Sequence, residues 1–396
     1  MKKEPLITIK NLLVSFGNKK SKTEVLHHIS FTVLQNEVLG IVGESGSGKS
    51  VTSLALMGLL PKKTSHLSGD ILFENKNLAF LKETDYRKLR GNEISMIFQE
   101  PMSALNPSIK CGEQVSEMLQ LHKKMSSSDA KKETLSLFEK VKLPQPKELY
   151  HRYPHQISGG QMQRVMIAMA ISCKPKLLIA DEPTTALDVT VQKEILQLLK
   201  ELQKETGMSL IFISHDLALV SEIADRVLVM HKGIVVEEGS VFEIFKLPKQ
   251  EYTKALLASR PPLDKRFEKL PTIASLADKS FTPKEITLSQ RAFQHKQIYL
   301  QKPILEIKNL EKEYFQNTGL FTKKRSIKAV NKVSFSVFEG ETLGLVGESG
   351  CGKSTLGKVI LQLEKATAGS IYFKGKDITK LSNTEIKKLR KDIQLI

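Results

Sequence analysis

A glycine-rich octapeptide places the strongest constraint on what this chain can fold into. Residues 43–50 read Gly-Glu-Ser-Gly-Ser-Gly-Lys-Ser and match the phosphate-loop pattern G-x-x-x-x-G-K-[ST] at every fixed position. The apolar run at 38–42 predicts a buried strand before the loop, and residues 51–60 carry apolar side chains at helical spacing behind it. A strand, a phosphate loop and a helix in this order predict an α/β nucleotide-binding domain.

The loop supplies the contacts that a polyphosphate requires. Glycines let backbone N–H groups curl around phosphate oxygens, and the helix N-terminus adds a partial positive charge. Lys49 is placed to reach the β- and γ-phosphates, and the Ser50 hydroxyl can bind Mg²⁺. The loop alone does not distinguish kinases, GTPases, helicases and transport ATPases. Its candidate nucleotide-binding residues are Gly43, Glu44, Ser45, Gly46, Ser47, Gly48, Lys49, Ser50 and Val51.

Composition narrows the class of protein further. The 396 residues allow two or three domains, and no apolar run approaches the roughly 18 residues of a membrane span. Cys111, Cys173 and Cys351 are scattered, which argues against a disulfide framework, a zinc site or an iron–sulfur cluster. The net charge of +17 allows an anionic partner, or reflects a lysine-rich solvated surface. Because no basic stripe carries interleaved aromatic residues, we expect no nucleic-acid partner.

Polar side chains stand where three further apolar runs end. Gln99 follows the run at 94–98, Asp181 and Glu182 follow 177–180, and His215 comes shortly after 210–213. The carboxyl ends of parallel strands meet at one edge of a sheet, where ligands bind. Two adjacent carboxylates suit Mg²⁺-dependent phosphate chemistry, with one acid for the metal and one for the attacking water. A histidine there can contact a γ-phosphate, although a lone histidine is more often structural.

The remaining stretches set the organisation of the chain. Residues 7–16 alternate like a strand, so Phe16 is either a core aromatic or a residue that stacks on adenine. Helical patterns cover 111–143 and 252–258, and a hairpin is expected around 232–233. Ser158-Gly159-Gly160-Gln161 opens another predicted helix and is either a second anion-binding tip or a plain glycine turn. Residues 260–303 are polar with weak periodicity, which is typical of a linker.

After this linker the chain repeats itself. Residues 305–310 echo 7–12, Tyr314 stands opposite Phe16, and residues 331–363 repeat 27–59 without a gap. The second loop at 347–354 reads Gly-Glu-Ser-Gly-Cys-Gly-Lys-Ser. Residues 393–396 align with 94–97, and no counterpart follows for Gln99, the glycine tip, the Asp-Glu pair or His215. We therefore expect a truncated product or fragment whose incomplete second domain exposes apolar edges, with a regulatory half-domain as the alternative.

The motifs together resemble the ATP-binding cassette family of transport ATPases over residues 5–260. The set comprises the phosphate loop, Gln99, Ile-Ser-Gly-Gly-Gln at 157–161, Leu-Leu-Ile-Ala-Asp-Glu-Pro at 177–183, Ala-Leu-Asp at 186–188 and His215. Ile157 stands where the family usually has leucine. Residues 102–107, 153–156, 180–192 and 252–257 are similar to the peptide-importer branch. The fused layout resembles the ATP-binding subunits for dipeptides, oligopeptides, glutathione or microcin.

The resemblance implies a fold and a domain plan. The fold would be the α/β cassette of P-loop NTPases, with a mixed-sheet core, an antiparallel β part and a helical subdomain, duplicated with an incomplete second copy. The first domain would cover 5–260, with a helical insertion at about 100–172 and a branch-specific tail at about 240–260. A linker would span 261–303, and 304–396 would form the N-terminal part of a second domain.

The resemblance also implies cofactors and roles, with ATP and Mg²⁺ bound. Glu182 would be the general base, and His215 and Gln99 would complete the catalytic set. The expected metal-binding residues are Ser50, Gln99, Asp181 and Ser354. Outside the first loop, the expected nucleotide-binding residues are Phe16, Ser158, Gly159, Gly160, Gln161, Asp188, Tyr314, Gly347, Gly350, Gly352, Lys353, Ser354 and Thr355. Phe16 and Tyr314 would stack on adenine, and the tip at 158–161 would cover the nucleotide of a facing cassette.

The implied setting is the cytoplasmic face of a membrane. Expected partners are transmembrane permease subunits, an extracytoplasmic solute-binding protein, and a second cassette or a second copy of the chain. Because the second domain lacks its own tip, we expect poor ATP hydrolysis unless two first domains pair. A soluble tandem cassette acting on ribosomes or DNA is the main alternative, disfavoured by Gln161, by a linker without a long charged helical arm and by the absence of paired cysteines. An inactive fragment is the third.

Overall fold

The computed structural model describes residues 4–18, 21–185, 187–262, 264–277, 282–316, 325–348 and 350–395. Ala186, Ser349 and Ile396, which belong to the motifs above, lie outside the described residues. The chain divides into two compact units. Unit 1 comprises Met1–Pro261 and Leu270–Thr282, and unit 2 comprises Pro262–Lys269 and Pro283–Ile396. Each unit is described by itself.

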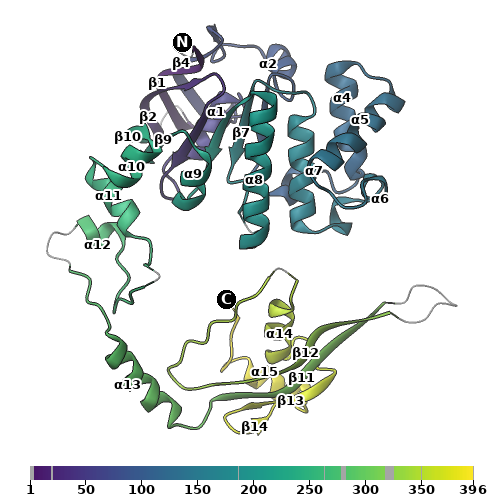
Figure 1. The fold of residues 1–396 in the computed structure, drawn as a ribbon, viewed down its shortest axis with the longest axis vertical. Helices are drawn as coiled ribbons and strands as arrows, with labels where there is room; N and C mark the ends of the chain where they lie inside the picture. Colours follow the sequence, from purple (N-terminus) through teal and green to yellow (C-terminus); the bar gives the residue numbers. More distant parts are fainter. Residues whose placement is uncertain are drawn as a thin grey trace. The chain divides into compact units, whose positions relative to one another are not determined.

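The core of unit 1 is a six-stranded mixed sheet in the order β10-β9-β3-β8-β7-β6 (Figure 1). The strands are β3 (Val38–Val42), β6 (Ile94–Ile97), β7 (Leu177–Asp181), β8 (Ser209–Ile213), β9 (Arg226–His231) and β10 (Ile234–Ser240). All neighbours pair in parallel except β9 and β10, which form the expected antiparallel hairpin. Every residue of β3, β6, β7 and β8 is buried, which explains why these strands read as continuous apolar runs.

A second, antiparallel sheet forms the other β part of unit 1. It contains β1 (Pro5–Asn18), β2 (Ser21–Leu34), β4 (Ser65–Phe73) and β5 (Lys76–Asn77) in the order β2-β1-β4-β5. Its inward side chains share one core with β3 and with helix α1 (Lys49–Leu56), through residues such as Ile9, Ile41 and Leu56. Helix α2 (Glu83–Leu89) follows β5 and adds Tyr86 and Leu89 to the same core.

Helices occupy the chain between β6 and β7. They are α3 (Pro101–Ala104), α4 (Cys111–Lys123), α5 (Ser127–Lys140), α6 (Pro146–Tyr150), the 3-10 turn η1 (Pro154–Gln156) and α7 (Gly159–Ile171). Helices α4, α5 and α6 lie together beside α7 (Figure 1). The helical patterns predicted for 111–143 and for the segment after Ser158 are confirmed.

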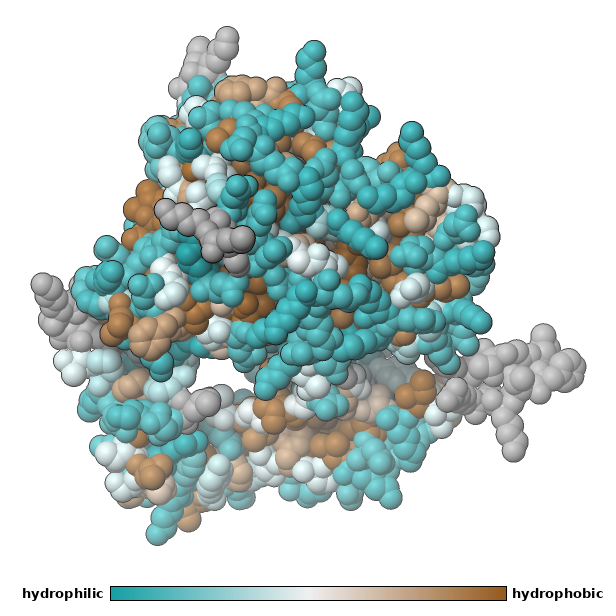
Figure 2. Space-filling view, turned by 45° about the horizontal axis from the view of Figure 1, so that its top comes forward, coloured by the Kyte–Doolittle hydropathy of each residue, from teal (hydrophilic) through white to brown (hydrophobic). Residues whose placement is uncertain are grey.

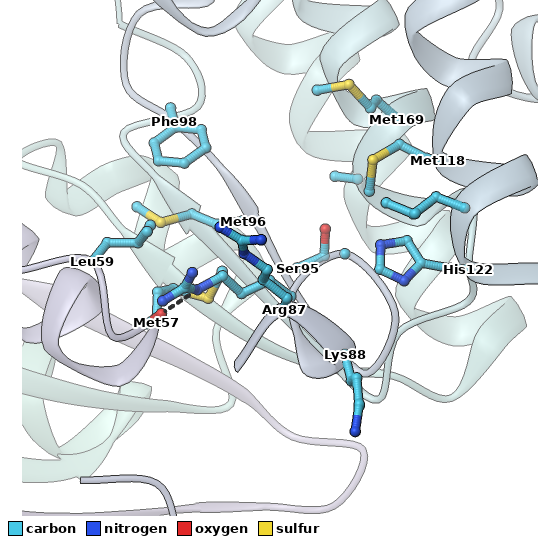
Figure 3. Close-up of a pocket in the computed structure, with 14 residues that line it drawn as sticks. Met57, Leu59, Arg87, Lys88, Ser95, Met96, Phe98, Met118, His122 and Met169 are labelled. Carbon is cyan, nitrogen blue, oxygen red and sulfur yellow. Dashed lines mark hydrogen bonds between the residues drawn. The ribbon is translucent and has the colours of Figure 1, made fainter. Parts of the chain in front are cut away.

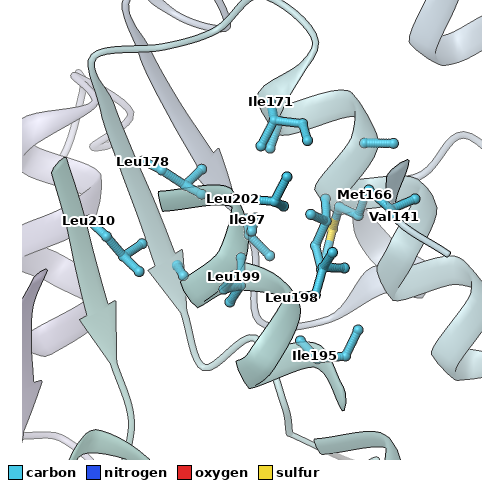
Figure 4. Close-up of a cluster of buried hydrophobic side chains, with 14 of the residues drawn as sticks. Ile97, Val141, Met166, Ile171, Leu178, Ile195, Leu198, Leu199, Leu202 and Leu210 are labelled. Atoms are coloured by element: carbon cyan, nitrogen blue, oxygen red, sulfur yellow. The ribbon is translucent and has the colours of Figure 1, made fainter. Parts of the chain in front are cut away.

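Helix α8 (Val189–Thr206) fixes this helical part to the main sheet. Its buried side chains recur at helical spacing and pack in one cluster with Met166 of α7 and with Leu178 and Leu210 of the sheet (Figure 4). The buried residues of the helix are Ile195, Leu196, Leu198, Leu199 and Leu202. After β8 the chain continues through α9 (Leu217–Ile223), α10 (Val241–Lys246), α11 (Glu251–Ala258) and α12 (Ile273–Ala277).

Unit 2 repeats the antiparallel part of unit 1. Its strands are β11 (Leu305–Gln316), β12 (Arg325–Val337), β13 (Ala368–Phe373) and β14 (Lys376–Asp377), in the order β12-β11-β13-β14. Helices α14 (Lys353–Ile360) and α15 (Asn383–Leu389) pack on this sheet through a small core that includes Leu356, Val359 and Leu389. The order of the four strands matches that of β2, β1, β4 and β5, so the predicted repeat is confirmed for this part.

The repeat fails at one element. Residues 341–348 match the sequence around β3 but form no strand, and Leu343, Leu345 and Val346 are 45%, 51% and 90% exposed. In unit 1, β3 is held by ladders to β8 and β9. The sequence contains no second copy of these partners, and a strand without ladder partners leaves its backbone groups unpaired. The expected exposure of apolar side chains in the second copy is therefore confirmed.

The predicted linker contains regular structure. Helix α12 packs against α11, and helix α13 (Leu288–Tyr299) precedes β11. Thr287 and Gln290 form a capping box at the start of α13. None of the described side chains of α13 is buried, so the helix needs no apolar stripe, and this explains why periodicity did not predict it.

A buried ion pair joins the two sheets of unit 1. Glu37 is only 5% exposed and accepts hydrogen bonds from Nε of Arg226 at 2.8 Å and from its Nη2 at 3.1 Å. The same guanidinium donates to the carbonyl oxygen of Thr32 at 2.6 Å, and Glu37 accepts the N–H of Leu34 at 2.6 Å. Arg226 on β9 thereby ties the main sheet to the end of β2.

We predict that Arg226→Met lowers the free energy of unfolding of unit 1 by about 3 kcal/mol, because it leaves the buried Glu37 carboxylate without its cation. Hydrogen exchange of peptides from β9 and β3 measures the change. The matched control is Lys140→Met, which removes an exposed pair with Glu205 and should change stability by less than about 1 kcal/mol. An equal effect of both substitutions would contradict the prediction.

Candidate functional site

The phosphate loop connects β3 to α1 and needs glycine at two points. Gly43 has a φ of 154°, and a Cβ there would lie 2.1 Å from the carbonyl oxygen of Met230. Gly48 has a φ of 101° and is the N-cap of α1. Both conformations are costly for residues with a side chain. The loop therefore has the tight geometry that lets backbone N–H groups surround an anion.

Lys49 lies inside the curve of this loop. Its ammonium group donates to the carbonyl oxygens of Gly43 and Glu44, both at 2.8 Å, and lies 3.4 Å from Oγ of Ser47. Burial lowers the pKa of Lys49, against the opposing effect of Glu182, Asp181 and Glu44. The cation is thus held where it can reach a phosphate group in the loop.

Ser50 and Asp181 bring a hydroxyl oxygen and a carboxylate oxygen together at the first turn of α1. The Ser50 hydroxyl donates to Oδ1 of Asp181 at 3.2 Å, and Ser53 donates to Oδ2 at 3.4 Å. Burial raises the pKa of Asp181 above its ordinary value. Hydroxyl and carboxylate oxygens suit Mg²⁺, which binds through one or two carboxylates, substrate phosphates and water. The described residues contain no cluster of three or more His, Cys, Asp or Glu side chains that could hold a metal by themselves.

Glu182 collects side chains from the ends of several strands. Its Oε2 accepts from Nε2 of Gln99 at 3.1 Å and from the Thr185 hydroxyl at 2.9 Å, and lies 3.1 Å from Nδ1 of His215. The backbone of Glu182 has a φ of 46°, and its N–H bonds to the carbonyl oxygen of Ile213 at 3.0 Å. Two of the predicted catalytic residues, Gln99 and His215, therefore each contact the third, Glu182. Sequence analysis did not identify Thr185, whose only signal is its position three residues after the acid.

The predicted tip at 158–161 begins helix α7. The Ser158 hydroxyl accepts the N–H of Gln161 at 3.3 Å, and the Gln161 side chain accepts the N–H of Ser158 at 3.0 Å. This capping box leaves Gly159 and Gly160 in the first turn of the helix. Asp188 caps α8 by accepting the N–H of Val191 at 3.0 Å. No contact joins this tip to Lys49 or Glu182 among the bonds of the described residues.

The aromatic residue proposed to stack on adenine has a different setting in each unit. Phe16 is partly buried and packs against the core beneath the antiparallel sheet. Tyr314 is partly exposed, and its hydroxyl bonds to Glu364, which raises the pKa of Tyr314. Thr355, in the first turn of α14, also bonds to Tyr314. Tyr314 therefore lies beside the helix that follows the second phosphate loop.

The second phosphate loop reproduces the internal bonds of the first. The ammonium group of Lys353 donates to the carbonyl oxygens of Gly347 at 2.6 Å and Glu348 at 2.7 Å. Gly350 and Gly352 have φ values of 82° and 101°, close to those of Gly46 and Gly48. Ser354 follows Lys353 in the first turn of α14, as Ser50 follows Lys49 in α1. The two loops are therefore equivalent in local geometry.

Comparison with known proteins places this chain in a family. The family model described as "ABC transporter" matches residues 26–185 and 330–396. The chain belongs to the ABC transporter family, and the fold class and the resemblance stated above are confirmed. It is 45% identical over 405 residues, 99% of this chain, to the glutathione import ATP-binding protein GsiA of Pectobacterium atrosepticum. It is 44% identical over 399 residues to the protein of that name from Escherichia coli O6:H1.

The chain spans only 63% of the length of these two relatives. Among solved structures, it is similar to the ATP-binding cassette MJ0796, a dimer in a post-hydrolysis state bound to ADP and phosphate, with a TM-score of 0.54 and 30% identity. That match covers 59% of this chain and 98% of MJ0796. It is also similar to cbiO1 of Clostridium perfringens, part of the complex cbiONQ, with a TM-score of 0.52, 31% identity and coverage of 62% and 92%. The roles of the individual site residues stay predictions.

We predict that Asp181→Asn stabilises unit 1 at neutral pH. Because burial raises the pKa of Asp181, the folded state holds its proton more tightly than the unfolded state, so stability falls as pH rises from about the ordinary pKa through the raised one. At neutral pH the ionised carboxylate therefore costs free energy that asparagine avoids. We expect a melting temperature about 2 °C higher at pH 7, with no gain below pH 4.

Differential scanning fluorimetry from pH 4 to pH 8 measures this difference between the variant and the unsubstituted chain. The matched control is Asp188→Asn, since asparagine caps a helix about as well as aspartate and Asp188 is not buried. A gain in stability from the control, or no gain from Asp181→Asn, would refute the prediction that the buried Asp181 carboxylate destabilises unit 1.

Proposed function

We propose that the chain is the ATP-binding and ATP-hydrolysing subunit of a membrane importer for peptides or peptide-like solutes. The observation that carries this proposal is the contact of Gln99, Thr185 and His215 with one carboxylate, Glu182. Glu182 directly follows Asp181, which contacts the phosphate-loop helix through Ser50. The relatives named as glutathione import proteins match 99% of this chain and support the choice of a peptide-like solute.

The chemistry follows from what each group can do. The loop and Lys49 would hold the β- and γ-phosphates, and Ser50 with Asp181 would hold Mg²⁺, which would supply charge neutralisation when bound. Glu182 accepts a proton from the attacking water as the general base. Gln99 and Thr185 fix the orientation of that carboxylate, and His215 contacts the γ-phosphate. Catalysis then rests on positioning and on stabilising charge that develops in the transition state.

Pairing completes the proposed site. The Ser158–Gln161 tip makes no bond to Lys49 or Glu182 within the described unit 1, so we assign it to the nucleotide of a facing cassette. A cassette dimer of MJ0796 with bound ADP and phosphate supports this arrangement. Two copies of unit 1 together can supply the two tips, whereas the described part of unit 2 contributes a phosphate loop without such a tip.

A groove beside Gln99 is the proposed docking site for a permease subunit. It has a volume of about 670 Å³ and lies between the end of the phosphate-loop helix, α2, β6 and helices α4 and α7 (Figure 3). Phe98, Met118, Met169 and Leu121 contribute apolar surface, and His122 points into the same space. Figure 2 shows mostly hydrophilic side chains, with hydrophobic ones in smaller patches, so a groove lined by several apolar side chains is a candidate docking surface.

The described residues form no helix long and apolar enough to cross a membrane. In this proposal the membrane-spanning parts belong to separate permease subunits, which also receive solute from an extracytoplasmic binding protein. The chain then acts as a peripheral subunit on the cytoplasmic face. Closure of paired cassettes on ATP drives the permease through the segment after Gln99.

We predict that Glu182→Gln slows ATP hydrolysis by about 10²–10⁴-fold and leaves Mg-ATP binding within a few-fold, because the general base is lost and the shape is kept. Phosphate release measures turnover, and titration calorimetry measures binding. Lys49→Ala is the counterpart, since it should abolish binding. Retained hydrolysis in Glu182→Gln would contradict the assigned role.

Light scattering on the Glu182→Gln chain tests the pairing. We expect a dimer with Mg-ATP and a monomer without it, because the blocked reaction leaves ATP between two first cassettes. The same chain with Ser158→Arg is the control, since a bulky cation at the tip should prevent ATP-dependent pairing. A monomer under both conditions would show that two first cassettes do not complete each other's ATP sites.

A further inference from the structure

Helix α11 contacts the proposed ATP site, but none of its residues has been given a role in that site. Its N-terminal end is anchored on β10, where the Glu237 carboxylate accepts the N–H groups of Lys249 at 2.7 Å and Gln250 at 3.1 Å. Helix α12 packs against α11 on the same unit. The helix therefore has fixed neighbours along its length. Residues 252–257 of this helix resemble the tail of the peptide-importer branch.

The first turn of α11 holds the phosphate loop. The N–H of Glu44 donates to the Tyr252 hydroxyl at 3.4 Å, and that hydroxyl lies 3.5 Å from Oε2 of Glu44. The ring of His231, at the end of β9, lies 4.0 Å from the ring of Tyr252, measured between centroids. Lys49 donates to the carbonyl oxygen of the same Glu44. Glu44, the second residue of the loop, is thus held both by Lys49 of the same loop and by Tyr252 from outside the loop.

The far end of α11 holds the segment that carries His215. Arg260 stands two residues after the helix, and its Nη2 donates to Oδ1 of Asp216 at 2.9 Å. Asp216 follows His215 directly and caps α9 by accepting the N–H of Ala218 at 2.8 Å. Its own N–H donates to the Ser214 hydroxyl at 2.9 Å. The guanidinium of Arg260 therefore ties the tail to the turn that places the histidine.

We propose that α11 is a brace that positions both sides of the ATP site, with Tyr252 acting on the phosphate loop and Arg260 acting on the His215 turn. Both are positioning residues, because each acts through a neighbour. The inference rests on the proposed function, since it assumes nucleotide between Lys49 and His215. It assigns to the branch-specific tail a role in nucleotide binding, with one task for the first turn of α11 and another for Arg260, two residues beyond its last turn.

The two ends should leave different signatures on nucleotide binding. The phosphate loop contacts the β-phosphate, which ATP and ADP share. Loss of the Tyr252 hydroxyl should therefore weaken both nucleotides equally. His215 is assigned to the γ-phosphate, which ADP lacks, so loss of Arg260 should weaken only the triphosphate. A merely structural role for α11 would weaken neither or both, without this split.

The experiment measures dissociation constants for Mg-ADP and for the slowly hydrolysed analogue Mg-AMP-PNP by titration calorimetry on the full chain. Tyr252→Phe keeps the ring against His231, and we expect both affinities to fall about five-fold, the scale of one lost hydrogen bond. For Arg260→Gln we expect AMP-PNP binding to weaken about five-fold while ADP binding changes less than two-fold. Arg260→Lys, which keeps the charge beside Asp216, should recover part of the AMP-PNP affinity.

The matched control is Lys254→Ala, on the same helix, whose ammonium group pairs with Glu251 at 2.7 Å. It should change neither affinity. Equal losses for Tyr252→Phe and Arg260→Gln on both nucleotides, or no loss in either variant, would overturn the brace. If the unsubstituted chain binds neither nucleotide, the proposed function fails and the brace fails with it, whereas normal binding that is insensitive to both substitutions removes the brace alone.

Discussion

The parallel ladders between β3, β8, β7 and β6 determine almost everything else in unit 1. They align the carboxyl ends of four strands, so the phosphate loop, His215, Glu182 and Gln99 emerge at one edge. Residues from positions 49 to 215 meet there because the pairing sets their order and spacing. Unit 2 shows the converse, since the segment matching β3 forms no strand where its parallel partners are lacking.

Burial of charge is the cost of this arrangement. Lys49 and Asp181 are 5% and 4% exposed. Burial lowers the pKa of Lys49 and raises the pKa of Asp181, and both shifts favour the neutral form of the side chain. The hydroxyl partners of Asp181 satisfy its oxygens without neutralising it. Such a site is ready for a bound cation and polyphosphate, whose charges complement it. The same charges make it less stable without them, which is a usual compromise between function and stability.

Sequence reasoning predicted the parts of the site that depend on local pattern. The loop is encoded by eight consecutive residues, and Gln99, Glu182 and His215 are marked by their positions after apolar runs. It missed the parts that depend on chain folding over long distances. Tyr252 contacts Glu44 across 208 positions, and Arg260 contacts Asp216 across 44, with no pattern near either residue to predict the contact. Helix α13 was missed because it buries no side chain.

Comparison of the two phosphate loops separates the geometry that nearby residues determine from the geometry that depends on the rest of the fold. Lys353 makes the same two carbonyl bonds as Lys49, and Gly352 has the same left-handed conformation as Gly48, although no strand precedes the second loop. The geometry that holds a phosphate is therefore contained in the loop and the first turn of its helix. The contacts around Glu182, to which the proposed function assigns phosphate cleavage, depend instead on the sheet, because Asp181, Glu182 and His215 come from the ends of other strands. Tyr252 contacts the locally determined loop through Glu44, and Arg260, just after the same helix, contacts the turn beside His215, which the sheet positions.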